Sequence, residues 1–83
     1  MRRTSSFIAS LAELPANVRG TLDCFNLSKA VSEHLMNLGF VPGLEVSVVG
    51  SGPGGDPRIY RVDGSEVELR NDVSRGIMIR VAR

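Results

Sequence analysis

The sequence is short of cysteine, of aromatic residues and of long apolar runs. Cys24 is the only cysteine among the 83 residues, so no disulfide forms within the chain, and a reducing cytoplasm fits it best. We expect Cys24 to be a small buried apolar residue rather than a reactive thiol. No segment approaches the ~20 apolar residues of a membrane span, and Ser10 and Glu13 interrupt the N-terminal segment where a signal peptide needs its apolar run. These absences predict a soluble cytoplasmic protein that does not insert into a membrane.

Neither sign of charge is in excess. Ten Lys and Arg residues oppose nine Asp and Glu residues, which gives a formal net charge of +1. Proteins that bind a phosphate backbone need a basic surplus, and those that bind single strands also need aromatic side chains on which bases stack. Three Phe and one Tyr are the whole aromatic supply. The composition therefore argues against nucleic acid as the partner, and the length allows one small domain.

One amphipathic helix is predicted within residues 26–38. Four apolar residues recur there at helical spacing, namely Leu27, Val31, Leu35 and Leu38. Asn26 or Ser28 can cap the start. At the end, Gly39 suits a left-handed conformation, Phe40 is expected to fold back on Leu35, and Pro42 prevents the helix from resuming.

Alternating residues predict five short strands, at residues 18–24, 44–49, 58–62, 65–69 and 77–81. Asp63 and Gly64 favour a two-residue hairpin turn, which pairs Arg61 with Glu66 and leaves Ile59 on the outer face. Residues 7–14 read as a short helical turn ended by Pro15, and residues 71–75 as a turn or a single helical turn. We therefore expect a mainly β fold, a small open barrel of about five strands with one helix between the first two strands. Residues 1–6 are predicted to be flexible, and residues 7–83 to form the single domain.

The glycines of VSVVGSGPGGDP follow the pattern G-x-G-x-x-G, which is typical of dinucleotide-binding loops. That function requires a helix after the loop, with the pyrophosphate at its N-terminus. Here Pro53 and Pro57 disfavour a helix, and the residues from Arg58 onward alternate as in a strand. We interpret the loop as a flexible connection, and no cofactor is expected.

No residues suited to catalysis are placed together by the sequence. Glu66 and Glu68 fall on an outward strand face, and no nucleophile has a base beside it, so a non-enzyme is expected. For a metal ion, the only candidates are Cys24, His34 and Glu33, and their spacing matches no known ligand motif. His34 reads more simply as a solvated helix-face residue.

The stretch LMNLGFVPGLEVSVVGSGPGGDPRIYRVDGSEVELR resembles the FeoA family, small cytoplasmic proteins of bacterial ferrous iron transport. The likeness lies in L-x-x-L-G-F-x-P-G, then E-V-x-V-V, G-D-P, R-V-D-G and V-E-L-R, and it continues to GIMIRV and back to SLAEL, over residues 10–82. Members usually have a Pro-Gly turn after the first leucine-rich segment, whereas LPANVRG has Pro15 without a following glycine.

The resemblance implies an SH3-like barrel and an accessory role beside FeoB, the membrane transporter with a cytoplasmic GTP-binding domain. Partner contacts are expected at the corner formed by Phe40, Val41 and Pro42, and at outward Ile59 and Met78 on neighbouring strands. The alternative is a small barrel that binds or senses a transition metal directly.

Overall fold

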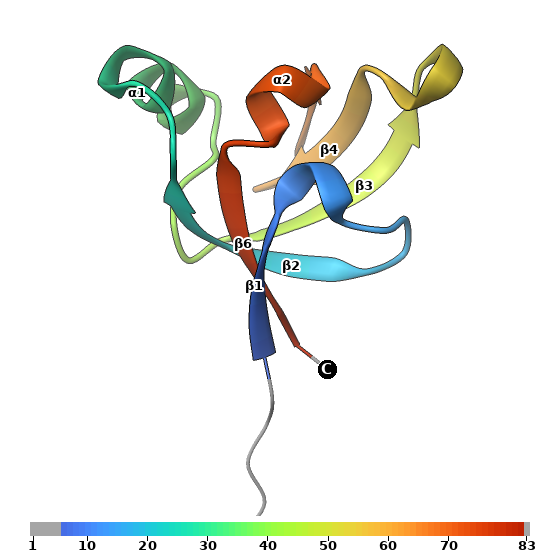
Figure 1. Ribbon diagram of the computed structural model, residues 1–83, viewed down its shortest axis with the longest axis horizontal. Helices are drawn as coiled ribbons and strands as arrows, with labels where there is room; N and C mark the ends of the chain where they lie inside the picture. Colours follow the sequence, from blue (N-terminus) through green and yellow to red (C-terminus); the bar gives the residue numbers. More distant parts are fainter. Residues whose placement is uncertain (1–5, 83) are drawn as a thin grey trace, which may run out of the picture.

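A computed structural model describes residues 6–82, and within this range six antiparallel strands form one sheet in the order β1-β6-β2-β3-β4-β5 (Figure 1). The strands are β1 (Ser6–Ser10), β2 (Arg19–Phe25), β3 (Glu45–Ser51), β4 (Arg58–Val62), β5 (Ser65–Leu69) and β6 (Ile77–Ala82). The helix α1 (Lys29–Asn37) lies between β2 and β3, and the single turn α2 (Asn71–Ser74) lies between β5 and β6. The sheet curls into an open barrel, with α1 and α2 at the same end, uppermost in Figure 1. The mainly β, SH3-like prediction is confirmed.

The N-terminal segment was predicted wrongly as a helical turn over residues 7–14. Its first half is β1, whose Phe7 pairs with Val81 of β6, and helix is confined to the 3-10 turn η1 (Leu11–Glu13). Ser10 begins this turn, because its Oγ accepts a hydrogen bond of 3.1 Å from the N–H of Ala12. Pairing with β6 provides hydrogen-bond partners along one side of β1 and adds a sixth strand to the expected five. Of the segment predicted to be flexible, Ser6 belongs to β1, and residues 1–5 lie outside the described range.

The hairpin of β4 and β5 pairs Arg61 with Glu66, as the sequence predicted, and Val62 with Ser65 next to the turn. Asp63 and Gly64 have φ values of 51° and 78°, and positive φ at both positions is what a type I′ turn requires. Arg61 Nη2 lies 2.6 Å from Glu66 Oε2 on the exposed face. Local turn chemistry therefore sets the register of this half of the sheet.

The ends of α1 also follow the prediction. Ser28 is the N-cap, and its Oγ accepts a hydrogen bond of 3.2 Å from the N–H of Val31. Gly39 has φ 109°, and the N–H of Phe40 donates to the carbonyl of Leu35 at 3.0 Å. The predicted apolar stripe is only partly buried, however: Leu35 is in the core, whereas Val31 and Leu38 are exposed.

The core fills the barrel with aliphatic side chains around Tyr60 and Phe40. The alternate β6 residues Ile77, Ile79 and Val81 are all buried, as a strand with one inward face requires. Leu11 of η1 is buried too, so the N-terminal turn closes over the core instead of lying on its surface. Among residues 6–82 no helix has the length and apolar character needed to cross a membrane.

The glycine-rich loop connects two strands. β3 continues to Ser51, a 3-10 turn η2 (Pro53–Gly55) follows, and β4 begins at Arg58. The N–H of Gly52 donates to the carbonyl of Pro57 at 2.7 Å, which closes the loop on itself. Because no helix follows the glycines, the loop does not form the phosphate cradle of a dinucleotide fold.

Candidate functional site

The three metal candidates lie on two different elements. Cys24 is on β2, whereas Glu33 and His34 are exposed on α1. Within residues 6–82 no group of three or more His, Cys, Asp or Glu side chains is placed to hold a metal ion. The fold therefore does not assemble these three residues into a convergent ligand set.

Cys24 is exposed, which corrects the expectation that it is buried. The pairing of β2 with β6 shifts between Leu22 and Cys24, and this bulge interrupts the alternation that places Leu22 in the core. Partial desolvation and the neighbouring Asp23 carboxylate raise the pKa of the Cys24 thiol. The raised pKa keeps the thiol protonated at neutral pH, so Cys24 reacts slowly as a nucleophile.

This pKa shift predicts slow alkylation of Cys24 in spite of its exposure. At pH 7 iodoacetamide should modify Cys24 more slowly than a cysteine in an unstructured peptide, because less of the thiol is ionised. The difference should narrow as the pH rises and the thiolate forms. Replacing Asp23 with Asn removes a negative neighbour, so the rate at pH 7 should increase. Equal rates for the protein and the peptide across the pH range would contradict the raised pKa.

The residues expected to contact a partner do not form one surface. Phe40 is fully buried in the core, so the prediction that it contacts a partner is wrong. Val41 and Pro42 beside it are exposed. Ile59 and Met78 are half-buried, and their strands are not neighbours, since β2 and β3 lie between β6 and β4 in the sheet. Ile59 also packs over Gly50 on the adjacent strand.

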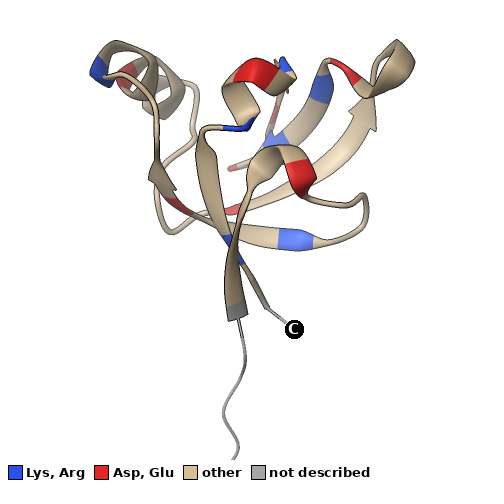
Figure 2. Cartoon of the chain, in the orientation of Figure 1, with Lys and Arg blue, Asp and Glu red and all other residues tan. Residues whose placement is uncertain are grey.

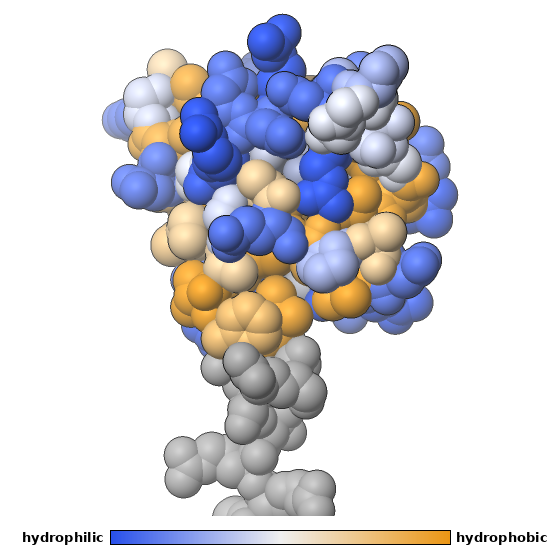
Figure 3. All heavy atoms as spheres, turned by 45° about the vertical axis from the view of Figure 1, so that its right-hand side comes forward, coloured by the Kyte–Doolittle hydropathy of each residue, from blue (hydrophilic) through white to orange (hydrophobic). Residues whose placement is uncertain are grey.

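Acidic and basic residues are interspersed along the strands and helices (Figure 2). Arg80 Nη2 lies 2.9 Å from Asp23 Oδ1, and Arg19 Nη1 lies 3.9 Å from Glu45 Oε1, so cations on the sheet face carboxylates on adjacent strands. Apolar side chains instead gather on the lower part of the face drawn in Figure 3, and β1 at this end of the barrel carries exposed Phe7 and Ile8.

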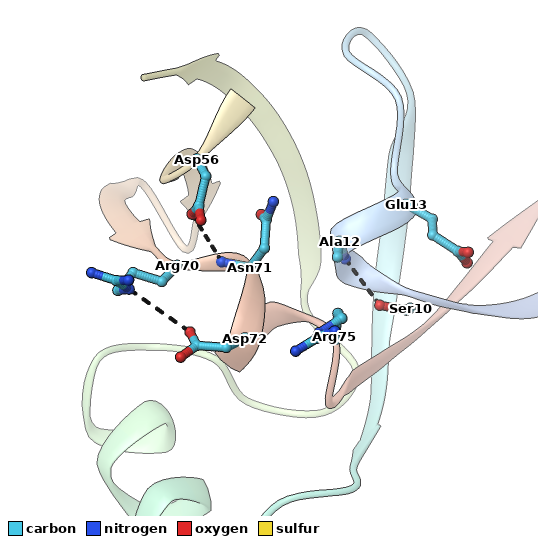
Figure 4. Close-up of a pocket in the computed structure, with 8 residues that line it drawn as sticks. All are labelled: Ser10, Ala12, Glu13, Asp56, Arg70, Asn71, Asp72 and Arg75. Atoms are coloured by element: carbon cyan, nitrogen blue, oxygen red, sulfur yellow. Dashed lines mark hydrogen bonds and ion pairs between the residues drawn. The ribbon is translucent and has the colours of Figure 1, made fainter. Parts of the chain in front are cut away.

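A polar pocket lies between η1, the η2 loop and α2 (Figure 4). Asp56 Oδ1 accepts a hydrogen bond of 3.0 Å from the N–H of Asn71, the first residue of α2. Arg70 Nε lies 4.0 Å from Asp72 Oδ1. Carboxylates and guanidinium groups line this pocket. The hydrogen bond between Asp56 and Asn71 holds the start of α2 against the η2 loop, whereas the Arg70–Asp72 pair lies within the α2 segment itself.

A second hollow, the α1–β5 groove, is apolar. It is bounded by α1 on one side and by the end of β5 and α2 on the other, and its lining residues are Ala30, Val31, His34, Leu35, Leu38, Glu68, Leu69, Arg70 and Val73. Val31 and Leu38, two members of the apolar stripe predicted on the helix, form its exposed wall on α1. Pattern alone indicates which helix face is apolar, and it leaves open whether that face is covered.

This geometry defines a class of protein: a small SH3-like barrel that presents an apolar groove between α1 and β5. The FeoA domain family matches residues 9–81. The chain therefore belongs to the FeoA family, as the sequence motifs indicated.

Solved structures agree with this assignment. The iron(II) transport protein A of Clostridium thermocellum is 29% identical with a TM-score of 0.81, and the match covers 87% of this chain and 44% of that one. FeoA of Chlorobium tepidum is 30% identical with a TM-score of 0.80, covering 87% and 69%. FeoA of Stenotrophomonas maltophilia, a zinc complex described as a prokaryotic SH3 domain protein and a suggested ferrous iron transport activating factor, is 31% identical with a TM-score of 0.74, covering 84% and 87%. A search of curated protein sequences finds no significant match.

Proposed function

We propose that this chain is a non-enzymatic, cytoplasmic accessory protein of bacterial ferrous iron uptake. In this role it binds the cytoplasmic GTP-binding part of a FeoB-like transporter and modulates its activity. The observation that carries the proposal is membership of the FeoA family across nearly the whole chain, together with the transport-activating role suggested for the Stenotrophomonas relative. A fold by itself does not specify a function, so the proposal is tested in cells.

Removing the gene from the bacterium that encodes it should lower the rate of ferrous iron uptake several-fold, and a plasmid copy should restore it. Uptake of radioactive ferrous iron under anaerobic conditions measures this directly. The control is a strain that lacks the FeoB-like transporter, in which deletion of the accessory gene should have no further effect. Unchanged uptake after deletion, with the transporter present, would contradict the proposal.

Exposed Val41 and Pro42, and half-buried Ile59 and Met78, remain proposed contact residues for the transporter. Val41→Glu is the sharpest probe, because its side chain is exposed and the change leaves the core intact. Ile59→Glu and Met78→Glu require a parallel measurement of unfolding, since both side chains are partly packed. Unchanged transporter binding by a folded variant removes that residue from the contact surface.

Direct metal binding is a second candidate, favoured by the zinc bound to the Stenotrophomonas relative. The side chains of this chain that bear on it are Cys24, His34 and Glu33, on the two separate elements described above. Titrating the protein with ferrous or manganous ion should give saturable amide shifts clustered near these residues if the metal binds there. Scattered, non-saturating shifts would remove this second function.

A further inference from the structure

One edge of the sheet has an unpaired backbone. β5 is the last strand in the sheet order and pairs only with β4 among the described residues. Ser65 and Val62 flank the two-residue turn and bond to each other, so alternate residues of β5 bond to β4. The backbone N–H and C=O groups of Glu66 and Glu68 therefore point away from β4, toward the open edge.

The α1–β5 groove lies beside the end of this edge. Glu68 and Leu69 line it from β5, while Val31 and Leu38 line it from α1 across the hollow. Leu35, which is buried, holds α1 against the core, so the groove has a fixed wall. A free strand edge beside an apolar groove is the arrangement by which domains add a bound peptide as an extra strand: main-chain bonds supply affinity, and alternate side chains fill the groove.

Charge indicates the chemistry of the occupant. The side chains of Glu66 and Glu68 both belong to the outward set of β5. Glu66 is neutralised by Arg61 at 2.6 Å, whereas Glu68 forms no ion pair within residues 6–82. A strand added beside β5 would place every second side chain next to these carboxylates, where Lys or Arg is favoured.

We propose that the α1–β5 groove binds an extended segment of a partner protein, in which apolar residues alternate with Lys or Arg, by adding it as a strand to β5. Its apolar side chains enter the hollow lined by Val31, Leu38 and Val73. Its basic side chains lie beside Glu68. This peptide-binding activity goes beyond the accessory role, because it specifies the conformation and the charge pattern of the bound segment.

The test uses the full chain, isotope-labelled, and a capped synthetic peptide of about eight residues, the span that a short edge strand pairs with, in which Val and Lys alternate. The peptide should cause saturable amide shifts at Val31, Leu38 and Glu68. It should also slow hydrogen exchange at the amides of Glu66 and Glu68, because only an added strand bonds them. A peptide with Glu in place of Lys should bind about tenfold more weakly at low salt.

Matched variants separate the groove from general surface effects. Met36 lies in the last turn of α1 and Leu38 is its C-cap, and the two side chains are similarly exposed, at 40% and 38%. Of the two, Leu38 lines the groove and Met36 does not. Leu38→Gln should weaken peptide binding about tenfold, as loss of an apolar interface anchor commonly does, whereas Met36→Gln should leave it unchanged. Glu68→Lys should reverse the preference, so that the peptide with Glu binds better, while Glu33→Lys on the outer part of α1 should not.

Several results would overturn the proposal. They are no saturable shift with the Lys peptide, binding without slowed exchange at Glu66 and Glu68, or equal binding of the Lys and Glu peptides. Concentration-dependent shifts of the same amides without peptide would assign the groove to a second copy of the chain. If the peptide does not bind, the groove proposal is wrong and the proposed role in ferrous iron uptake is unaffected. If the peptide binds but deletion of the gene does not change uptake, the accessory role is wrong and the groove proposal stands.

Discussion

Replacing Gly76 with alanine should lower the free energy of unfolding by about 3 kcal/mol, at the upper end of the range for overpacking a tight site. A Cβ at Gly76 would overlap Leu27 Cδ2 and would lie 2.9 Å from the carbonyl oxygen of Asn26. Leu27 can move, but the Asn26 carbonyl is backbone, and the N–H of Asn26 already donates to the carbonyl of Gly76 at 2.6 Å. The methyl group must therefore displace the segment that leads into α1. Urea unfolding measures the loss.

Gly50→Ala is the matched control for this prediction. A Cβ at Gly50 comes no closer than 3.4 Å to Ile59 Cδ1, an ordinary contact, so its effect on stability should be small. Adding Leu27→Ala to Gly76→Ala should restore part of the loss, since the two changes act on one contact. Equal losses of unfolding free energy for Gly76→Ala and Gly50→Ala would contradict the close packing of Gly76, between α2 and β6, against the segment that leads into α1.

Replacing Arg58 with methionine should lower the free energy of unfolding by about 3 kcal/mol, the sum of two charge-assisted hydrogen bonds reduced for partial exposure. The Arg58 guanidinium donates to the carbonyl of Ala12 at 2.7 Å and to the carbonyl of Leu14. It also lies 5.7 Å from the centroid of the Tyr60 ring. These contacts fasten η1 to β4, so their loss leaves two carbonyls unpaired and loosens the turn over the core.

Arg61→Met on the same strand is the control for this effect. Arg61 forms an exposed ion pair with Glu66, which contributes about 0.5 kcal/mol. Arg58→Lys keeps the charge but loses the planar pair of donors, and it should fall between the two variants. Equal losses for Arg58→Met and Arg61→Met would mean that η1 is held by its apolar residues alone.

The features that sequence predicted well depend on local chemistry. The β4–β5 register follows from Asp63 and Gly64, whose positive φ values specify the turn. The end of α1 follows from Gly39 and from the backbone bond between Phe40 and Leu35. In both places residues close in the sequence determine the local conformation, so it could be predicted without knowledge of distant contacts.

The features that sequence missed depend on distant contacts. β1 becomes a strand because β6, at the other end of the chain, pairs with it. Phe40 could not serve both as a core residue packed near Leu35 and as an exposed contact, and burial prevailed. The alternation in β2 gave no sign of the bulge that exposes Cys24.

The candidate site was predicted least well. The apolar stripe on α1 was identified correctly, but periodicity does not show which part of a stripe meets the core. Leu35 and partly buried Leu27 do so, which leaves Val31 and Leu38 as one wall of the α1–β5 groove. The other wall comes from β5 and α2, so the groove exists only after the sheet has curled.

The most direct test of the accessory role is a calorimetric titration of the purified chain into the cytoplasmic GTP-binding domain of the FeoB-like transporter from the same bacterium. We predict saturable binding of the wild-type chain, with Met36→Gln unchanged and Leu38→Gln weaker if the transporter supplies the added strand. Saturable binding that is insensitive to Leu38→Gln would place the contact on another surface. Absence of binding by the correctly folded wild-type chain would contradict the proposed function.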